Sequence, residues 1–121
     1  MGADLTVEGI EVPVFGFEVS ERAGNAGYFR DCYNETGLFW NIGLDWWKLT
    51  RRYEMEGKII SDDERGCILR PEFVDEFSET VETAFRNSKV AKKKEYKGWM
   101  HVFRLFINTA KKAGKGIRFS V

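Results

Sequence analysis

The sequence has few of the residues that usually build metal sites or covalent catalytic sites. It holds two cysteines, Cys32 and Cys67, and one histidine, His101, among 121 residues. A structural zinc site takes four ligands, so these three side chains cannot form one without help from carboxylates. Because no secretory signal precedes them, we expect two reduced thiols and no disulfide. The sequence therefore predicts no metal and no cofactor.

Long apolar runs and the common nucleotide-binding motifs are also missing. No run approaches the roughly 18 residues that a membrane-spanning helix needs. The patterns GxxxxGK[ST], GxGxxG after a strand, and HExxH do not occur. The start, MGADLTVEG, lacks the basic and apolar regions of a signal peptide. We therefore expect a soluble cytoplasmic protein that has no membrane partner.

Charge is balanced over the whole chain but not along it. Residues 1–88 carry 18 acidic and 9 basic side chains, whereas residues 89–121 carry 1 and 10. The basic segment could bind nucleic acid or another polyanion. Its densest cluster is Lys92, Lys93 and Lys94. Alternatively, the basic segment packs beside the acidic segment 61–82, and the two charges balance. We favour this second interpretation, because the aromatic residues near the lysines belong to a predicted core stripe, so nucleic acid is not the expected partner.

The two ends of the chain are predicted to form strands. Polar and apolar residues alternate around 5–7, and the VPVFGFEV run at 12–19 is typical of a second strand. Pro13 would place that strand near a sheet edge. A last short strand is predicted at 117–121, and the glycine-containing segment 21–27 is predicted to be a turn.

Three helices are predicted, at 36–56, 71–87 and 92–113, each from apolar residues at helical spacing. Gly57 and Gly114 would end the first and the third. The residues between the first two helices are predicted to be a connection. The fold class is therefore α+β, a single domain over the whole chain with a short antiparallel sheet of terminal strands packed against about three helices. A mostly α domain is the alternative.

The first predicted helix is apolar on two faces. One stripe consists of Leu38, Phe39, Ile42, Trp46, Leu49 and Tyr53. The opposite face, here called the tryptophan face, carries Trp40, Leu44 and Trp47. A helix that is apolar on two sides is either covered on both or buried on one and used for binding on the other. The tryptophan face is thus a hypothetical binding surface for a protein partner or a second copy of the chain, unless strands cover it.

The densest polar cluster lies just before this helix. It consists of Tyr28, Arg30, Asp31, Tyr33 and Asn34. As a ligand site, it would use Arg30 to bind an anion and the tyrosines to stack on the ligand. Alternatively, it is a structured loop in which Asp31 pairs with an arginine and Asn34 caps the helix. Cys32 lies within the cluster, but the single histidine is far away in sequence, so no catalytic pair is predicted.

The same region carries a resemblance. Residues 27–34 read GYFRDCYN, and LFW at 38–40 and GLDWW at 43–47 follow. With the opening MGADL, this pattern resembles a set of small bacterial and phage proteins that carry GYFRDSYN and a later GLSWW. Cys32 and Asp45 stand where serine is usual in that set. The resemblance implies a shared fold and a bacterial or phage context, and it carries no catalytic residue to this chain.

These observations predict a function through contacts. We expect a protein without enzymatic activity that acts as an interaction or accessory module. The alternative is a small-ligand-binding protein or enzyme that uses the loop 28–34. A third hypothesis is nucleic-acid binding through the basic segment 89–118.

Overall fold

The computed structural model describes residues 2–10, 19–62 and 66–120. These residues form one five-stranded sheet, five α-helices and one 3-10 helix, so the predicted α+β class is confirmed. The predicted strand at 12–19 falls almost wholly outside the described residues. The elements are β1 (Gly2–Val7), α1 (Glu21–Asn25), β2 (Tyr28–Cys32), α2 (Leu38–Asn41), α3 (Trp46–Met55), β3 (Ile59–Asp62), β4 (Gly66–Leu69), η1 (Pro71–Phe73), α4 (Val74–Arg86), α5 (Lys94–Ala113) and β5 (Ile117–Ser120).

The sheet places the first and last strands side by side at its centre. Its order is β2-β1-β5-β4-β3, and every neighbouring pair is antiparallel. Leu5 of β1 lies opposite Phe29 on one side and Phe119 on the other. All three side chains are fully buried, as the predicted terminal strands require. The centre of the sheet therefore depends on both ends of the chain.

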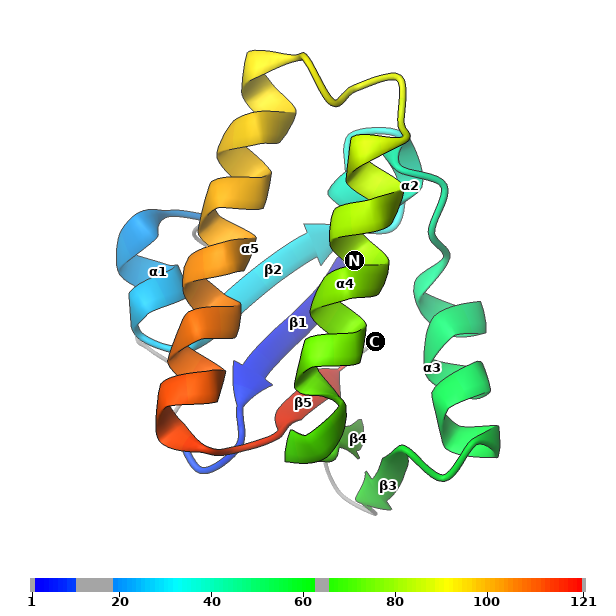
Figure 1. Cartoon of the computed structure of the whole chain (residues 1–121), viewed down its shortest axis with the longest axis vertical. Coiled ribbons are helices and arrows are strands. Elements are labelled where there is room, and N and C mark those ends of the chain that lie inside the picture. Colours follow the sequence, from blue (N-terminus) through cyan, green and yellow to red (C-terminus); the bar gives the residue numbers. More distant parts are fainter. Residues whose placement is uncertain (1, 11–18, 63–65, 121) are drawn as a thin grey trace.

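The helices α4 and α5 cover one face of this sheet, and they lie next to each other across it (Figure 1). Most residues of the two predicted stripes are buried, and Phe77 of α4 and Phe103 of α5 are fully enclosed with their ring centroids 5.6 Å apart. Gly114 ends α5 in the left-handed conformation, with φ 64°. A side chain disfavours that conformation, which explains the predicted stop there. None of the described helices is both long and apolar enough to cross a bilayer.

Ion pairs join the basic helix α5 to the acidic helix α4. Arg104 contacts Glu82 through two hydrogen bonds of 2.7 and 2.8 Å, and Lys111 lies 2.8 Å from Asp75. These are the contacts that the charge balance between the two segments predicts. Because the pairs are largely exposed, each adds no more than about 1 kcal/mol. They set the charge pattern of the surface more than the stability of the core.

The single helix predicted at 36–56 is wrong. The structure divides that segment into α2 and α3, with a break at 42–45 where Gly43 has φ 78°. Asp45 begins α3, because its carboxylate accepts a hydrogen bond of 3.0 Å from the Lys48 N–H. An aspartate at this position caps a helix, while inside a helix it is unfavourable. The predicted apolar stripe is nevertheless buried at all six positions.

Two further segments were expected to be irregular and are strands. The predicted loop at 28–34 begins with β2, and the predicted connection after Gly57 contains the hairpin of β3 and β4. Gly57 itself has φ 73° just after α3, as expected for a residue that ends a helix. The strands are four or five residues long, so their alternation is too short to identify them. Their pairing with distant strands decides the structure.

Candidate functional site

Asp31 organises the segment that carries the tryptophan face. Its side chain is fully buried at the end of β2. One carboxylate oxygen accepts a hydrogen bond of 2.7 Å from the Leu38 N–H, and the other accepts one of 3.0 Å from the Phe39 N–H. The second oxygen also accepts a bond of 2.8 Å from the indole nitrogen of Trp46. A single carboxylate therefore caps α2 and fixes the first residue of α3.

Burial raises the pKa of the Asp31 carboxyl above its usual value. The hydrogen bonds from Phe39, Trp46 and Leu38 act in the opposite direction, because they favour the charged form. All three partners are donors, so both oxygens are already used inside the protein. Asp31 is thus a structural residue rather than a ligand-binding one. This agrees with the prediction of a structured loop, but the partners of Asp31 are two backbone N–H groups and an indole instead of the expected arginine.

The two consecutive tryptophans at the start of α3 have opposite environments. The Trp46 ring stacks on Phe39, with the centroids 3.7 Å apart and the planes nearly parallel at 3°. Trp46 is only 3% exposed, while Trp47 is 62% exposed. Neighbouring residues on a helix point about 100° apart, so fixing Trp46 in the core turns Trp47 outward. Asp31 therefore determines the direction of Trp47 through Trp46.

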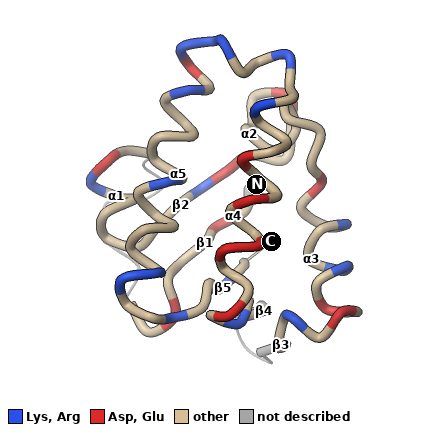
Figure 2. Tube along the Cα trace, viewed as in Figure 1, with Lys and Arg blue, Asp and Glu red and all other residues tan. Residues whose placement is uncertain are grey.

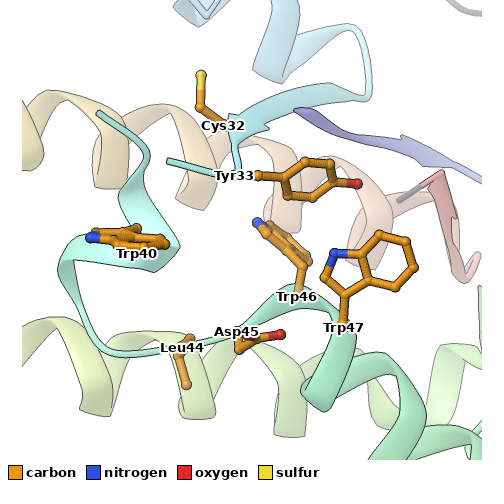
Figure 3. A pocket seen from close by; sticks show the side chains of 7 residues that line it. All are labelled: Cys32, Tyr33, Trp40, Leu44, Asp45, Trp46 and Trp47. Carbon is orange, nitrogen blue, oxygen red and sulfur yellow. The ribbon is translucent and has the colours of Figure 1, made fainter. Parts of the chain in front are cut away.

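A small pocket opens beside Trp47, here called the tryptophan pocket. Its volume is about 90 Å³. It is lined by Cys32, Tyr33, Trp40, Leu44, Asp45, Trp46 and Trp47. Figure 3 shows Trp40 and Trp47 on opposite sides of the pocket, with Trp46 between them. Trp40 is 60% exposed, Leu44 is half-buried, and the Tyr33 and Trp47 rings are 6.1 Å apart. The structure thus brings the predicted tryptophan face together, and no described strand covers it.

The pocket offers little for catalysis. Its titratable groups are Cys32, Tyr33 and Asp45, and the Asp45 carboxylate already caps α3. Burial raises the pKa of the Tyr33 hydroxyl, which keeps it protonated at neutral pH. The one imidazole, His101, lies on α5 and contacts Glu21 at 2.7 Å. Within the described residues, no three side chains gather in a way that could hold a metal ion.

The structure does not bring the five predicted ligand residues into one site. Alternation along β2 places Tyr28 and Arg30 on the face of the sheet opposite to Asp31. There the Tyr28 hydroxyl donates a hydrogen bond of 2.5 Å to Asp4, and the Arg30 guanidinium donates to the same carboxylate at 3.0 Å. Asp4, which lies opposite Arg30 on the neighbouring strand β1, is the partner that the sequence did not predict. The pairing of two distant strands brings it there.

Tyr33 and Asn34, the other two predicted ligand residues, follow β2. Tyr33 lines the tryptophan pocket. Asn34 makes a local turn, in which its side-chain oxygen accepts a bond of 2.9 Å from the Thr36 N–H. The predicted cap of a helix by Asn34 is therefore wrong, since Gly37 stands at the start of α2 and Asp31 supplies the acceptors. The predicted ligand cluster is therefore divided: Tyr28 and Arg30 bind Asp4, Asp31 holds α2 and α3, and Asn34 forms a local turn. Only Tyr33 lines the tryptophan pocket.

Tyr28 should titrate late. Burial, together with the hydrogen bond to Asp4, raises the pKa of Tyr28 from 10.0 to about 12. We expect an alkaline absorbance titration to show a tyrosinate step near pH 12 that is missing in Tyr28→Phe and retained in Tyr33→Phe. The unfolded chain loses this proton near 10 and the folded one near 12, so the free energy of unfolding should fall across that interval and not below it. Retention of the late step in Tyr28→Phe would contradict the assignment.

The predicted lysine cluster lies at the connection between α4 and α5, where Figure 2 shows positive charge gathered. Lys92, Lys93 and Lys94 are all exposed, and none forms an ion pair with the described residues. The nearby aromatic residues are not available for stacking on bases, because Tyr96 is 8% exposed and Trp99 packs on Phe29. Single-stranded nucleic acid is usually bound by exposed rings beside such charges. The cluster therefore has the charge of a nucleic-acid site without its aromatic surface.

Known proteins do not indicate what the pocket binds. Searches of protein-family models, of curated proteins and of solved structures found no match to this chain. The resemblance to small bacterial and phage proteins stays a prediction. The function must therefore be inferred from the geometry of the tryptophan pocket and the surface around it.

Proposed function

We propose that this protein acts without catalysis, by binding another protein through the tryptophan pocket. The observation that carries this proposal is the exposure of Trp40 and Trp47, at 60% and 62%, on the two sides of one pocket. The other two tryptophans contact the core. Tryptophan is the residue most enriched where a few side chains dominate a protein interface. Two exposed tryptophans beside one pocket are typical of such an interface.

Energetics support this proposal. A tryptophan side chain can bury roughly 150–250 Å² when it is covered. At about 25 cal/mol per Å², covering half of one ring stabilises a complex by about 2–3 kcal/mol. Neither ring belongs to the core formed by the described residues. Their exposure is therefore best explained by a partner that covers them.

The size of the pocket favours an inserted side chain over a metabolite. Pockets for small molecules usually enclose roughly 300–1,000 Å³. The tryptophan pocket, with about 90 Å³, has room for a single apolar side chain. The small-ligand alternative at 28–34 has weaker support, because Asp31 is fully engaged inside the protein and Arg30 is held by Asp4.

Trp47→Ala should remove binding without unfolding the protein. Because Trp47 is 62% exposed, we expect the free energy of unfolding to change by less than about 1 kcal/mol in a denaturant titration. In affinity capture from lysate of the source cells, a partner retained by the wild-type protein should be lost by Trp47→Ala.

The matched control is Ile60→Ala, which removes an apolar side chain that is 49% exposed on β3, away from the pocket. It should capture the same partner as the wild-type protein. Equal capture by all three proteins would exclude the tryptophan pocket as the binding site. Loss of folding in Trp47→Ala would mean that the ring belongs to the core, and the proposal would lose its main support.

A further inference from the structure

The outer side of α3 continues the binding surface away from the tryptophan pocket. A second, shallower hollow of about 450 Å³ is lined by Lys48, Arg51, Arg52, Met55 and Glu56. Trp47 is one turn from Arg51 and two turns from Met55, which is 81% exposed. The pocket and the hollow therefore lie next to each other along one helix, over about 12 Å at 1.5 Å per residue. A segment that enters the pocket can run along this hollow.

The hollow is positively charged, and its cations lack internal partners. Lys48, Arg51 and Arg52 form no ion pair with any carboxylate of the described residues. The Arg52 guanidinium instead lies over the Tyr53 ring, 5.3 Å from its centroid. Other cations of the described residues do form ion pairs, at Arg30, Lys58, Arg104 and Lys111, although the cluster of Lys92, Lys93 and Lys94 does not. The cations of the hollow are thus free for a partner.

Acidic groups of α3 lie at its ends. Figure 2 shows Lys and Arg along the helix and acidic residues at its lower end. Asp45 is used as the cap, and Glu56 is held by Lys58 at 3.0 Å. Glu54, near the end of α3, forms no ion pair with the described residues. The lining of the hollow holds three cations, Lys48, Arg51 and Arg52, against one carboxylate, that of Glu56, which leaves an excess of positive charge.

Resting on the proposed function, we propose that the partner binds with an acidic segment that carries one bulky apolar side chain. The apolar side chain enters the tryptophan pocket, between Trp40 and Trp47. The acidic side chains of the same segment lie against Lys48, Arg51 and Arg52. Charge complementarity selects this partner, because a basic segment would be repelled by the three cations. Met55 adds an adaptable apolar contact at the far end.

The test uses a display library of random twelve-residue peptides selected on the full-length protein. We expect the selected peptides to share a large apolar residue followed by two or more Asp or Glu. Their affinity should fall about tenfold or more for the double variant Lys48→Glu and Arg51→Glu, and with added salt. The matched control reverses the same number of charges elsewhere, with Lys92→Glu and Lys93→Glu, and should change affinity by less than about twofold.

The outcomes separate this inference from the proposed function. In one outcome, the selected peptides need Trp47 and yet are neutral or basic. In another, they bind the double variant Lys48→Glu and Arg51→Glu normally. Either result would overturn the acidic partner but leave the proposed binding at the tryptophan pocket standing. Selected peptides that bind Trp47→Ala as well as the wild-type protein, or a failure to select any peptide, would count against both. A concentration-dependent dimer in sedimentation that Trp47→Ala abolishes would identify a second copy as the occupant and overturn the acidic peptide.

Discussion

Asp31→Ala should lower the free energy of unfolding by about 3–5 kcal/mol, the largest effect of any polar substitution in the described structure. The change leaves the N–H groups of Leu38 and Phe39 and the indole N–H of Trp46 without their acceptor in a buried place. Each unsatisfied buried donor costs about 1–3 kcal/mol, and the losses are not fully additive. Denaturant unfolding followed by fluorescence measures the change directly.

The control for this prediction is Asn34→Ala, three residues along the chain. Its side chain makes only an exposed local turn with Thr36, so the cost should stay within about 1 kcal/mol. Asp31→Asn should also be strongly destabilising, because an amide group offers one acceptor oxygen where the carboxylate uses two. A wild-type stability for Asp31→Asn would show that the hydrogen-bond network does not hold α2 and α3.

Phe77→Ala should cost about 3–5 kcal/mol of unfolding free energy. Phe77 is fully buried on α4 at the centre of an aromatic cluster. Its ring lies within 6.5 Å, between centroids, of Phe39, Trp46, Tyr53, Phe103 and Phe119. Removing it leaves a cavity bordered by five rings from four different elements, and rigid rings cannot close it.

Phe73→Ala is the matched comparison, four residues earlier in η1. Phe73 is half-buried and lies beside the ammonium group of Lys58, 5.6 Å from its ring centroid. We expect a cost of about 1–2 kcal/mol, because less area is uncovered and water can enter the space. Equal costs for the two variants, in the same denaturant titration, would mean that the aromatic cluster does not depend on its central ring.

Helical spacing predicted the parts of the fold that depend on long stripes. The stripes of α4 and α5 are eleven or more residues long, and each position repeats the same signal. Spacing also predicted which side chains of the segment 38–53 are buried. Spacing did not predict the break at Gly43. The six buried residues stand at intervals that fit one continuous helix, although they belong to two helices and the turn between them.

Short strands were predicted only at the ends of the chain. β3 and β4 have four residues each, and β2 has five, which include the charged pair Arg30 and Asp31. Such a strand is stabilised by a partner strand that is far away in the sequence. For β2 this partner is β1, whose Asp4 accepts a hydrogen bond from Arg30. No local pattern contains that information.

The candidate site was predicted from the residue types and not from their arrangement. The second apolar face identified Trp40, Leu44 and Trp47, and the structure shows these three around one pocket. The sequence could not indicate that Asp31 holds Trp46 inward, because this contact joins a strand to a helix fifteen positions later. The surface of α3 beyond the pocket was also missed, since its lysine and arginines look like any solvated helix face.

The position of β5 beside β1 has a consequence for the order in which the protein can fold during synthesis. Asp4 pairs with Ser120, so the middle of the sheet joins β1, the first of the five strands to leave the ribosome, to β5, the last of them. Until β5 emerges, β1 with β2 and β3 with β4 can form only as separate two-stranded pairs, which are marginally stable alone. The aromatic rings of α4 and α5 therefore have no complete sheet to cover until β5 has been synthesised.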